Sequence, residues 1–253
     1  MRHMRRARIR QITFVPYQVH RSNFDLRNFV LAKMAEEAAQ CRNVYIIGAQ
    51  CTGKTTLVNS LEKNFDSSSY GQPGKQMSKP IVIREVARAV LREKKFSRDD
   101  ITNSPSRALQ LQKYILEAQM EAEKAASKSD HPSPWYICDR SGLDPIVYAR
   151  VFVGEEAADD MLASETWQEL EARMKTGIVI LCEAGCSWLV DDGTRLMPDG
   201  MEDWMRVDDA YRKLLAAREI DYTVCSRNLI SCADRVQLVK ERLGLLAASS
   251  QSS

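Results

Sequence analysis

The stretch GAQCTGKTT, from Gly48 to Thr56, decides the fold class of this chain. It follows the apolar run VYII at 44–47 and leads into LVNSL at 57–61. A glycine, four residues and then Gly-Lys-Thr, placed between a buried strand and the start of a helix, is the pattern of a phosphate-binding loop. The sequence therefore predicts a loop that holds a nucleoside triphosphate.

The residue types in this loop suit a phosphate ligand. Glycines allow successive backbone N–H groups to converge on phosphate oxygens, and the dipole of the following helix favours negative charge there. The Lys54 ammonium adds positive charge near the transferable phosphate, and the Thr55 hydroxyl is placed to ligate magnesium. The alternative is a glycine-containing turn with an incidental lysine. We expect ATP and Mg²⁺ as cofactors, with nucleotide contacts from Gly48, Gln50, Cys51, Thr52, Gly53, Lys54, Thr55 and Thr56.

Composition indicates an ordinary globular protein with one large α/β domain. The chain has 253 residues, of which 44% are hydrophobic and 28% charged. A formal net charge of +2 gives no overall basic field, so a nucleic-acid partner is not expected. Seven cysteines without a CxxC pair, and three scattered histidines, favour reduced thiols over zinc or disulfides and predict a cytoplasmic protein. No apolar run approaches the roughly 20 residues that span a bilayer.

The N-terminal segment differs from the rest of the chain. MRHMRRARIRQ carries five arginines, and no acidic residue precedes Asp25. Two interpretations are open: a solvated basic extension that touches an acidic protein or membrane surface, or a mitochondrial targeting peptide, although the segment is poor in serine. A helix is expected over Asn23–Ala39. We assign 1–41 to this extension and helix, 42–246 to the nucleotide-binding domain and 247–253 to a disordered tail.

Beyond the phosphate loop, apolar runs alternate with helical patterns. The expected strands lie at 43–47, 81–83, 135–138, 177–182 and 222–225. The expected helices lie at 54–64, after 84–88 up to residue 94, at 108–127, from about 144, at 158–174 and at 233–243. This alternation predicts the α/β class, a parallel sheet with helices on both faces. Ligands of such folds bind at the carboxyl ends of the strands.

Charged residues follow two of the expected strands. Asp139 ends the run WYIC, where a carboxylate would hold magnesium together with Thr55; the alternative is a structural aspartate paired with Arg140. Glu85 follows the strand at 81–83 and is placed to orient or deprotonate an acceptor hydroxyl, whereas a surface ion pair is the alternative. Arg140 would offer its planar guanidinium to a phosphate or to the acceptor.

The polar segment Asp191–Ile220 follows the fourth expected strand. It has two glycines and a proline early, and it carries Arg195, Arg206 and Arg212 among many acids. Long loops in compact domains often form lids, and a lid arginine neutralises charge that builds on a transferred phosphoryl group. We expect residues 191–211 to form a mobile lid with Arg195 or Arg206 in a catalytic role; a solvated helical hairpin with local ion pairs is the alternative.

Four stretches in order carry a family resemblance: GAQCTGKTTLV, REVAR, CDRSGLDPIVYA and DDGTRLMPDGMEDWMRVDDAYRKLL. With them, residues 42–246 resemble the NadR-like P-loop family, an AAA-type group named after a ribosylnicotinamide kinase. The resemblance implies a nucleoside- or nucleotide-kinase-like core with an arginine-bearing lid. The site residues that it implies are Gly53, Lys54 and Thr55 for phosphate, Asp139 for metal or acceptor, and Arg140, Arg195 and Arg206 for charge stabilisation.

Two functions of different classes are open from the sequence. The first is a small-molecule kinase that moves the γ-phosphoryl group of ATP to a nucleoside-like hydroxyl. The second is a regulatory NTP-binding protein that reports its nucleotide state to a protein or membrane partner. The strand-end acids favour the kinase, since a switch needs no acceptor base. The candidate catalytic residues are Lys54, Glu85, Asp139, Arg140, Arg195 and Arg206.

Overall fold

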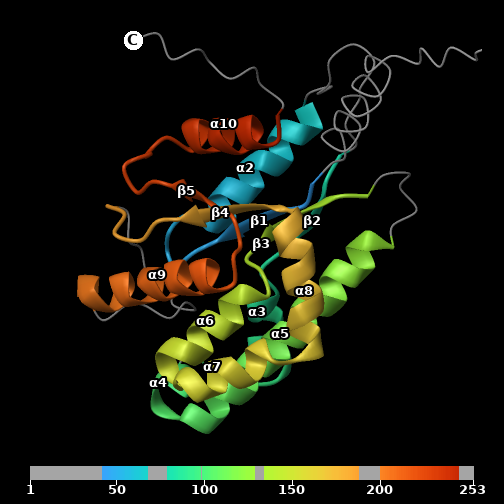
Figure 1. The fold of residues 1–253 in the computed structure, drawn as a ribbon. Coiled ribbons are helices and arrows are strands. Elements are labelled where there is room, and N and C mark those ends of the chain that lie inside the picture. The colour runs from blue at the N-terminus through green and yellow to red at the C-terminus, as the bar shows by residue number, and fades with distance from the viewer. Residues whose placement is uncertain (1–41, 68–78, 98, 129–133, 188–199, 245–253) are drawn as a thin grey trace, which may run out of the picture. The chain divides into compact units, whose positions relative to one another are not determined.

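Five parallel strands form one sheet in the computed structural model, in the order β2-β3-β1-β4-β5 (Figure 1). The strands are β1 (Val44–Ile47), β2 (Ile81–Ile83), β3 (Tyr136–Asp139), β4 (Ile178–Cys182) and β5 (Thr223–Cys225). The strand order places β1, which leads into the phosphate loop, between β3 and β4. The carboxyl ends of these three strands therefore meet beside the loop, where ligands of open α/β sheets bind.

The structure describes residues 42–67, 79–97, 99–128, 134–187 and 200–244. All of them belong to a single compact unit. The helix expected over 23–39, the basic extension and the tail at 247–253 lie outside the described residues, so their assignments stay predictions.

Helices cover both faces of the sheet (Figure 1). On one face, Val44 and Ile46 of β1 pack in a cluster with α2 (Lys54–Ser67) and α10 (Cys232–Arg242). On the other face, Tyr45 and Ile47 pack in a larger cluster. Its helices are α5 (Pro105–Ser127), α6 (Leu143–Phe152), α7 (Glu155–Leu162), α8 (Glu165–Thr176) and α9 (Gly200–Ala217). The predicted α/β architecture is confirmed, because the paired strands are parallel and helices cover both faces of the sheet. The side chains of β1 alternate between these two faces.

A third, smaller apolar cluster lies away from the sheet. It joins α5 to the short helices α3 (Val86–Glu93) and α4 (Asp99–Asn103) through Val90, Ile101, Leu111 and Ile115. The sequence patterns do not predict α4. In the described part of the chain, none of the helices combines the length and apolar character needed to cross a membrane.

The single helix expected over 158–174 is wrong. The chain forms two helices there, α7 and α8, which are separated at Ala163 and Ser164. The Ser164 hydroxyl accepts a hydrogen bond from the Trp167 backbone N–H at 3.2 Å and caps the start of α8. A serine that satisfies a free backbone donor in this way starts a new helix.

The lid expected over 191–211 is helical and not a loop in its second part, whereas its mobility stays a prediction. Residues 200–211 belong to α9, in which Trp204, Val207 and Tyr211 are buried in the core. Their helical spacing puts an apolar stripe against the sheet, and this stripe outweighs the polar character of the segment as a whole. Residues 188–199, including Arg195, lie outside the described residues.

Candidate active site

The loop between β1 and α2 packs closely against β4 and contains two glycines with positive φ. Gly48 has φ +133°, and a side chain there would place its Cβ 2.4 Å from the carbonyl oxygen of Cys182 on β4. Gly53, at φ +84°, also lies in the left-handed region, where glycine is favoured. Glycine at the first position therefore allows the loop to pass directly over β4.

Lys54 lies inside this loop. Its buried ammonium donates hydrogen bonds to the carbonyl oxygens of Gly48, at 2.8 Å, and of Ala49. Burial, followed by the nearby Arg140 guanidinium, lowers the pKa of Lys54 to about 8. The charged form is thus held among loop carbonyls, where an incoming phosphate would be the stronger partner for it.

Three distant side chains hold the loop in place. Arg235 of α10 donates to the carbonyl oxygen of Thr52 at 2.8 Å, and the indole N–H of Trp204 on α9 donates to that of Gln50 at 2.8 Å. The Tyr148 hydroxyl of α6 donates to the side-chain oxygen of Gln50 at 2.9 Å. None of the three is a site candidate from the sequence, because these contacts form between segments far apart along the chain.

Asp139 lies at the end of β3, opposite Ile46 of β1. It is 2% exposed, and its Oδ1 has no hydrogen-bond partner among the described residues. A buried carboxylate oxygen without a partner is costly unless a cation or ordered water satisfies it. A Mg²⁺ ion beside the half-buried Thr55 fits this arrangement.

The described residues contain no cluster of three or more His, Cys, Asp or Glu side chains that would hold a metal. Magnesium does not need such a cluster, because it keeps several waters and binds through one or two protein oxygens plus substrate phosphates.

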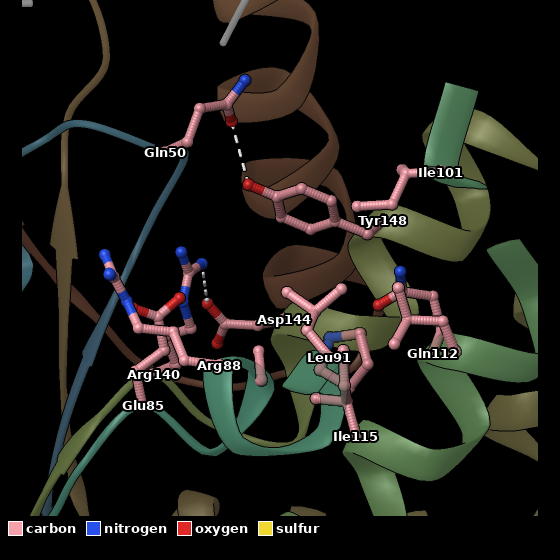
Figure 2. A pocket seen from close by; sticks show the side chains of 13 residues that line it. Gln50, Glu85, Arg88, Leu91, Ile101, Gln112, Ile115, Arg140, Asp144 and Tyr148 are labelled. Carbon is pink, nitrogen blue, oxygen red and sulfur yellow. Dashed lines mark hydrogen bonds and ion pairs between the residues drawn. The ribbon is translucent and has the colours of Figure 1, made fainter. Parts of the chain in front are cut away.

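Arg140 lies beside the carboxylates of Glu85 and Asp144 (Figure 2). Its backbone has φ +86°, which is rare for a residue with a side chain and typical of strained functional positions. Its Nε donates to Glu85 at 2.8 Å, and its Nη1 lies 3.4 Å from Asp144. The Arg88 Nε donates to the other oxygen of Glu85 at 2.8 Å.

The surroundings of Glu85 and Asp144 shift the pKa values of these two carboxyl groups in opposite directions. Burial would raise the pKa of Glu85, but Arg140 and then Arg88 outweigh it and hold the pKa at about 2. At Asp144 burial is the larger effect and raises the pKa, although Arg140 opposes it. Glu85 is therefore a permanently charged group at neutral pH, and Asp144 is the more basic of the two.

Asp144 does not emerge as a site residue from the sequence. Its carboxylate accepts hydrogen bonds from the Ser141 backbone N–H at 2.7 Å and from the Tyr211 hydroxyl at 2.6 Å. The available signal is its position in DRSGLDP, five residues after Asp139, at the first turn of α6. By pattern alone, that position indicates only the start of a helix.

A pocket adjoins this network (Figure 2). Gln50 of the phosphate loop forms part of its wall, and Glu85, Arg140 and Asp144 form another part. The remaining lining comes from α3, α4, α5 and α6, and consists of Ala87, Arg88, Leu91, Ile101, Leu111, Gln112, Ile115, Pro145 and Tyr148. The fold thus provides a second, partly apolar compartment next to the loop.

The predicted site residues are not all brought together. Lys54, Asp139, Arg140 and Glu85 lie around the ends of β1, β2 and β3. Arg206 is exposed on α9, where it pairs with Asp203 at 2.7 Å and lies over the Phe152 ring. Neither of these partners lines the pocket.

A family model described as an AAA domain matches residues 43–231. The chain belongs to this AAA-domain family. The match runs from the start of β1 to the start of α10, so this AAA domain contains all five strands of the sheet. A search of curated proteins finds no match.

Solved structures resemble the AAA domain at low sequence identity. The NadR protein in complex with NAD and AMP-PNP matches with a TM-score of 0.60 and 13% identity, over 93% of this chain and 61% of that one. The NadR protein in complex with NR gives 0.61 and 14%, over 92% and 63%. This chain thus spans less than two thirds of the length of either NadR chain. With the family match, these structures confirm the predicted NadR-like resemblance.

A smaller enzyme matches over nearly its whole length. Deoxyadenosine kinase from M. mycoides with bound dATP gives a TM-score of 0.55 and 16% identity, over 80% of this chain and 99% of that one. At this level of identity the likeness establishes the fold alone.

Proposed function

We propose that this protein is an ATP-dependent kinase that transfers the γ-phosphoryl group to a hydroxyl of a nucleoside-like small molecule. The observation that carries the proposal is the pocket lined by both Gln50 of the phosphate loop and the Glu85–Arg140–Asp144 network. A phosphoryl acceptor bound there would lie beside the phosphates held by the loop. The protein named deoxyadenosine kinase, which shares the fold, supports the same class of reaction.

On the nucleotide side, the chain holds and neutralises the triphosphate. Backbone N–H groups of the loop and the start of α2 bind phosphate oxygens, and the Lys54 ammonium adds charge close to the γ-phosphoryl group. Thr55 and Asp139 would hold Mg²⁺, which would offset the negative charge of the phosphates. Arg140 lies between the loop and the pocket, so its guanidinium is placed to stabilise charge that moves during transfer.

On the acceptor side, the carboxylates orient the hydroxyl. Phosphoryl transfer passes through a loose transition state in which positioning matters more than early proton removal. Glu85, with a pKa of about 2, is a weak base, so we assign it the role of a hydrogen-bond acceptor that fixes the hydroxyl. Asp144, whose pKa is raised, is the group better suited to take the proton.

An acceptor screen with purified protein tests the proposal. The full chain is incubated with labelled MgATP and a panel of nucleosides, and phosphorylated products are separated by chromatography. We expect transfer to at least one nucleoside and loss of that transfer in Lys54→Ala. Hydrolysis of ATP without any phosphorylated acceptor across the panel would contradict the kinase assignment.

A regulatory nucleotide switch is the second candidate. It is favoured by one contact, the hydrogen bond from Trp204 of α9 to the carbonyl oxygen of Gln50, which couples a whole helix to the phosphate loop. In a switch, triphosphate alone would move this helix and create a surface for a protein or membrane partner. Hydrogen exchange of α9 with and without an ATP analogue distinguishes the two, because a kinase should need the acceptor as well for full protection.

A further inference from the structure

Gln50 belongs to both halves of the proposed site. It is a residue of the phosphate loop, and it also lines the pocket beside the Glu85–Arg140–Asp144 network, which we call the acceptor pocket. Gln50 is 1% exposed, and its side-chain Nε2 has no hydrogen-bond partner among the described residues. A buried amide nitrogen with unmet hydrogen-bonding capacity is costly, so this group indicates a ligand that accepts a hydrogen bond from it.

Two other side chains fix the position of Gln50. The Trp204 indole N–H donates to its backbone carbonyl oxygen at 2.8 Å, and the Tyr148 hydroxyl donates to its Oε1 at 2.9 Å. Burial raises the pKa of Tyr148 to about 12, so this hydroxyl keeps its proton at neutral pH and is available as a donor. In Figure 2 the Gln50 oxygen faces Tyr148, and the nitrogen lies on the other side of the amide. The amide is therefore oriented without a substrate, and its donor end is left over.

The place of Gln50 in the chain indicates which atom would satisfy this nitrogen. An NH₂ group donates hydrogen bonds and accepts none, so its partner must carry a free lone pair. Among loop residues 48–56, all of which the structure describes, Gln50 alone lines the acceptor pocket. In the proposed kinase the γ-phosphoryl group passes from the loop to this pocket, and its oxygens are negatively charged. A phosphoryl oxygen is therefore a stronger partner for the nitrogen than a neutral group.

We propose that Gln50 is a catalytic residue whose Nε2 donates a hydrogen bond to an oxygen of the phosphoryl group while that group moves from ATP to the acceptor. This inference rests on the kinase function proposed above and assigns a further residue to its transfer step. Charge is spread over the equatorial oxygens of the phosphoryl group in the transition state. A neutral donor that is oriented beforehand stabilises this charge and leaves the ion pair between Glu85 and Arg140 intact.

Gln50 takes no part in the proton balance of the transfer. The bond from the γ-phosphorus to its bridging oxygen breaks, and the electron pair leaves with ADP. A new bond forms from the acceptor oxygen to the phosphorus, and the proton of the acceptor hydroxyl passes to Asp144. The contribution of Gln50 is a hydrogen bond that strengthens in the transition state, so its loss should lower turnover more than ATP affinity.

The test uses variants of the full-length protein. Gln50→Leu removes the donor and keeps the approximate size of the side chain, and Tyr148→Phe removes the hydroxyl that orients the amide. Gln119→Leu is the matched control: Gln119 on α5 is 1% exposed, its Oε1 has no partner among the described residues, and it does not line the pocket. The measurements are MgATP affinity by calorimetry, kcat and acceptor KM with the best nucleoside of the panel, and ATP hydrolysis without an acceptor.

We expect Gln50→Leu to lower kcat by about 100-fold, because one preorganised donor to a charged transition-state oxygen contributes about that much. MgATP affinity and acceptor KM should stay within about threefold of the wild type. Tyr148→Phe should lower kcat by about tenfold, but it should add almost nothing in the Gln50→Leu background, since its effect passes through the amide. Gln119→Leu should lower the melting temperature and keep kcat within about twofold.

The outcomes separate this inference from the proposed function. If the wild type phosphorylates a nucleoside and Gln50→Leu keeps its kcat, the kinase stands and the role of Gln50 is refuted. A higher acceptor KM at unchanged kcat also refutes this role, because Gln50 would then only bind the acceptor.

Hydrolysis of ATP decides the remaining cases, because water is then the acceptor of the phosphoryl group. If the wild type hydrolyses ATP but phosphorylates no nucleoside, the kinase is refuted. In that case a loss of about 100-fold in the hydrolysis rate of Gln50→Leu supports the role of Gln50, and an unchanged rate overturns it. If the wild type shows neither reaction, both the kinase and the role of Gln50 fall.

Discussion

The phosphate loop and the acceptor pocket lie side by side, yet they are built in different ways. The loop is a single run of residues, 48–56, whose shape follows from two glycines and the strand and helix that flank it. The pocket gathers side chains from the loop, the end of β2, the end of β3 and four helices. One half of the site is thus local in sequence, and the other half exists only after folding.

The difference also appears in how each half is held. The loop is fixed mainly by hydrogen bonds to its backbone carbonyls, from Lys54, Trp204 and Arg235. The pocket is fixed by ion pairs between Glu85, Arg140 and Asp144, the side chains to which we assign contacts with the acceptor. Substitutions in the loop should therefore affect nucleotide binding with little effect on stability, whereas substitutions in the pocket should affect both acceptor transfer and folding.

The largest expected effect is that of Lys54→Ala. The change removes the ammonium from the loop, so MgATP affinity should fall by about 100-fold and turnover by at least about 1000-fold. Calorimetry and the acceptor assay measure the two losses, and circular dichroism should show an unchanged fold. Lys63→Ala on the exposed face of α2 is the control. Unchanged MgATP affinity in Lys54→Ala would rule out the nucleotide site as placed.

Asp139→Asn should be the next most damaging to turnover. If Asp139 serves the metal, turnover should fall by about 100-fold, and nucleotide binding should depend less on magnesium. The melting temperature should stay the same or rise, because the change removes charge from a buried oxygen that has no partner among the described residues. A lower melting temperature with normal turnover would instead show a purely structural aspartate.

The sequence predicted the local half of the site better than the assembled half. The phosphate loop, the five strands and most helices follow from short patterns of glycine and apolar residues, and the structure bears out the resulting parallel sheet. Glu85 and Arg140 could be named individually because each follows a strand. Their pairing could not be predicted, because they are 55 positions apart and meet only when β2 and β3 pair.

The residues that the sequence did not reveal share one property. Asp144, Tyr148 and Gln112 lie on helices where their spacing fits an ordinary buried face, and only tertiary packing turns them toward the pocket. α9 is a different case, because the helical spacing of Trp204, Val207 and Tyr211 is a local signal that the acidic, glycine-containing segment around it obscured. The contacts of Trp204 with Gln50 and of Tyr211 with Asp144 form only after folding.

Glu85→Gln tests whether a substitution in the pocket lowers both phosphoryl transfer and the free energy of unfolding. Transfer should fall by about 100-fold while ATP affinity stays within about twofold, since we assign Glu85 to the acceptor and not to the nucleotide. The free energy of unfolding should fall by on the order of 3 kcal/mol, because the Arg140 side chain, which is 13% exposed, loses its closest charged partner. Arg88→Gln, at a position 42% exposed in its side chain, should cost less than about 1 kcal/mol.

The difference in unfolding free energy between wild type and Glu85→Gln should decrease as the pH falls. The pKa of Glu85 is about 2 in the folded protein and ordinarily 4.5, so its contribution is present above pH 4.5 and is lost as the pH falls toward 2. Urea titrations of wild type and Glu85→Gln should therefore converge in acid. A constant difference across this range would contradict the ion pair as its source.

The pH dependence of nucleotide affinity tests the loop in the alkaline range. Lys54, with a pKa of about 8, loses its charge as the pH rises, so ATP affinity should fall by up to about tenfold per unit above pH 8. The free energy of unfolding of the nucleotide-free protein should instead rise between pH 8 and 10.5, because in this range the unfolded state binds more protons than the folded state. Lys54→Ala should lack both dependences, which separates them from other titrating groups.

The smallest expected effect is that of Arg206→Ala, and it decides whether α9 takes part in transfer. In the structure this arginine touches Asp203 and the Phe152 ring and is largely exposed, so its removal should change the melting temperature little and turnover by less than about threefold. Arg212→Ala is the comparison on the same helix. Arg212 pairs with Asp208 at 2.7 Å and with Glu183 at 3.3 Å, and its loss should destabilise the fold without a specific effect on transfer. Arg206→Ala could instead lower kcat by about 100-fold at constant ATP affinity. In that case α9 must move so that this guanidinium reaches the transferred phosphoryl group. The acceptor half of the site would then be incomplete until α9 closes on it.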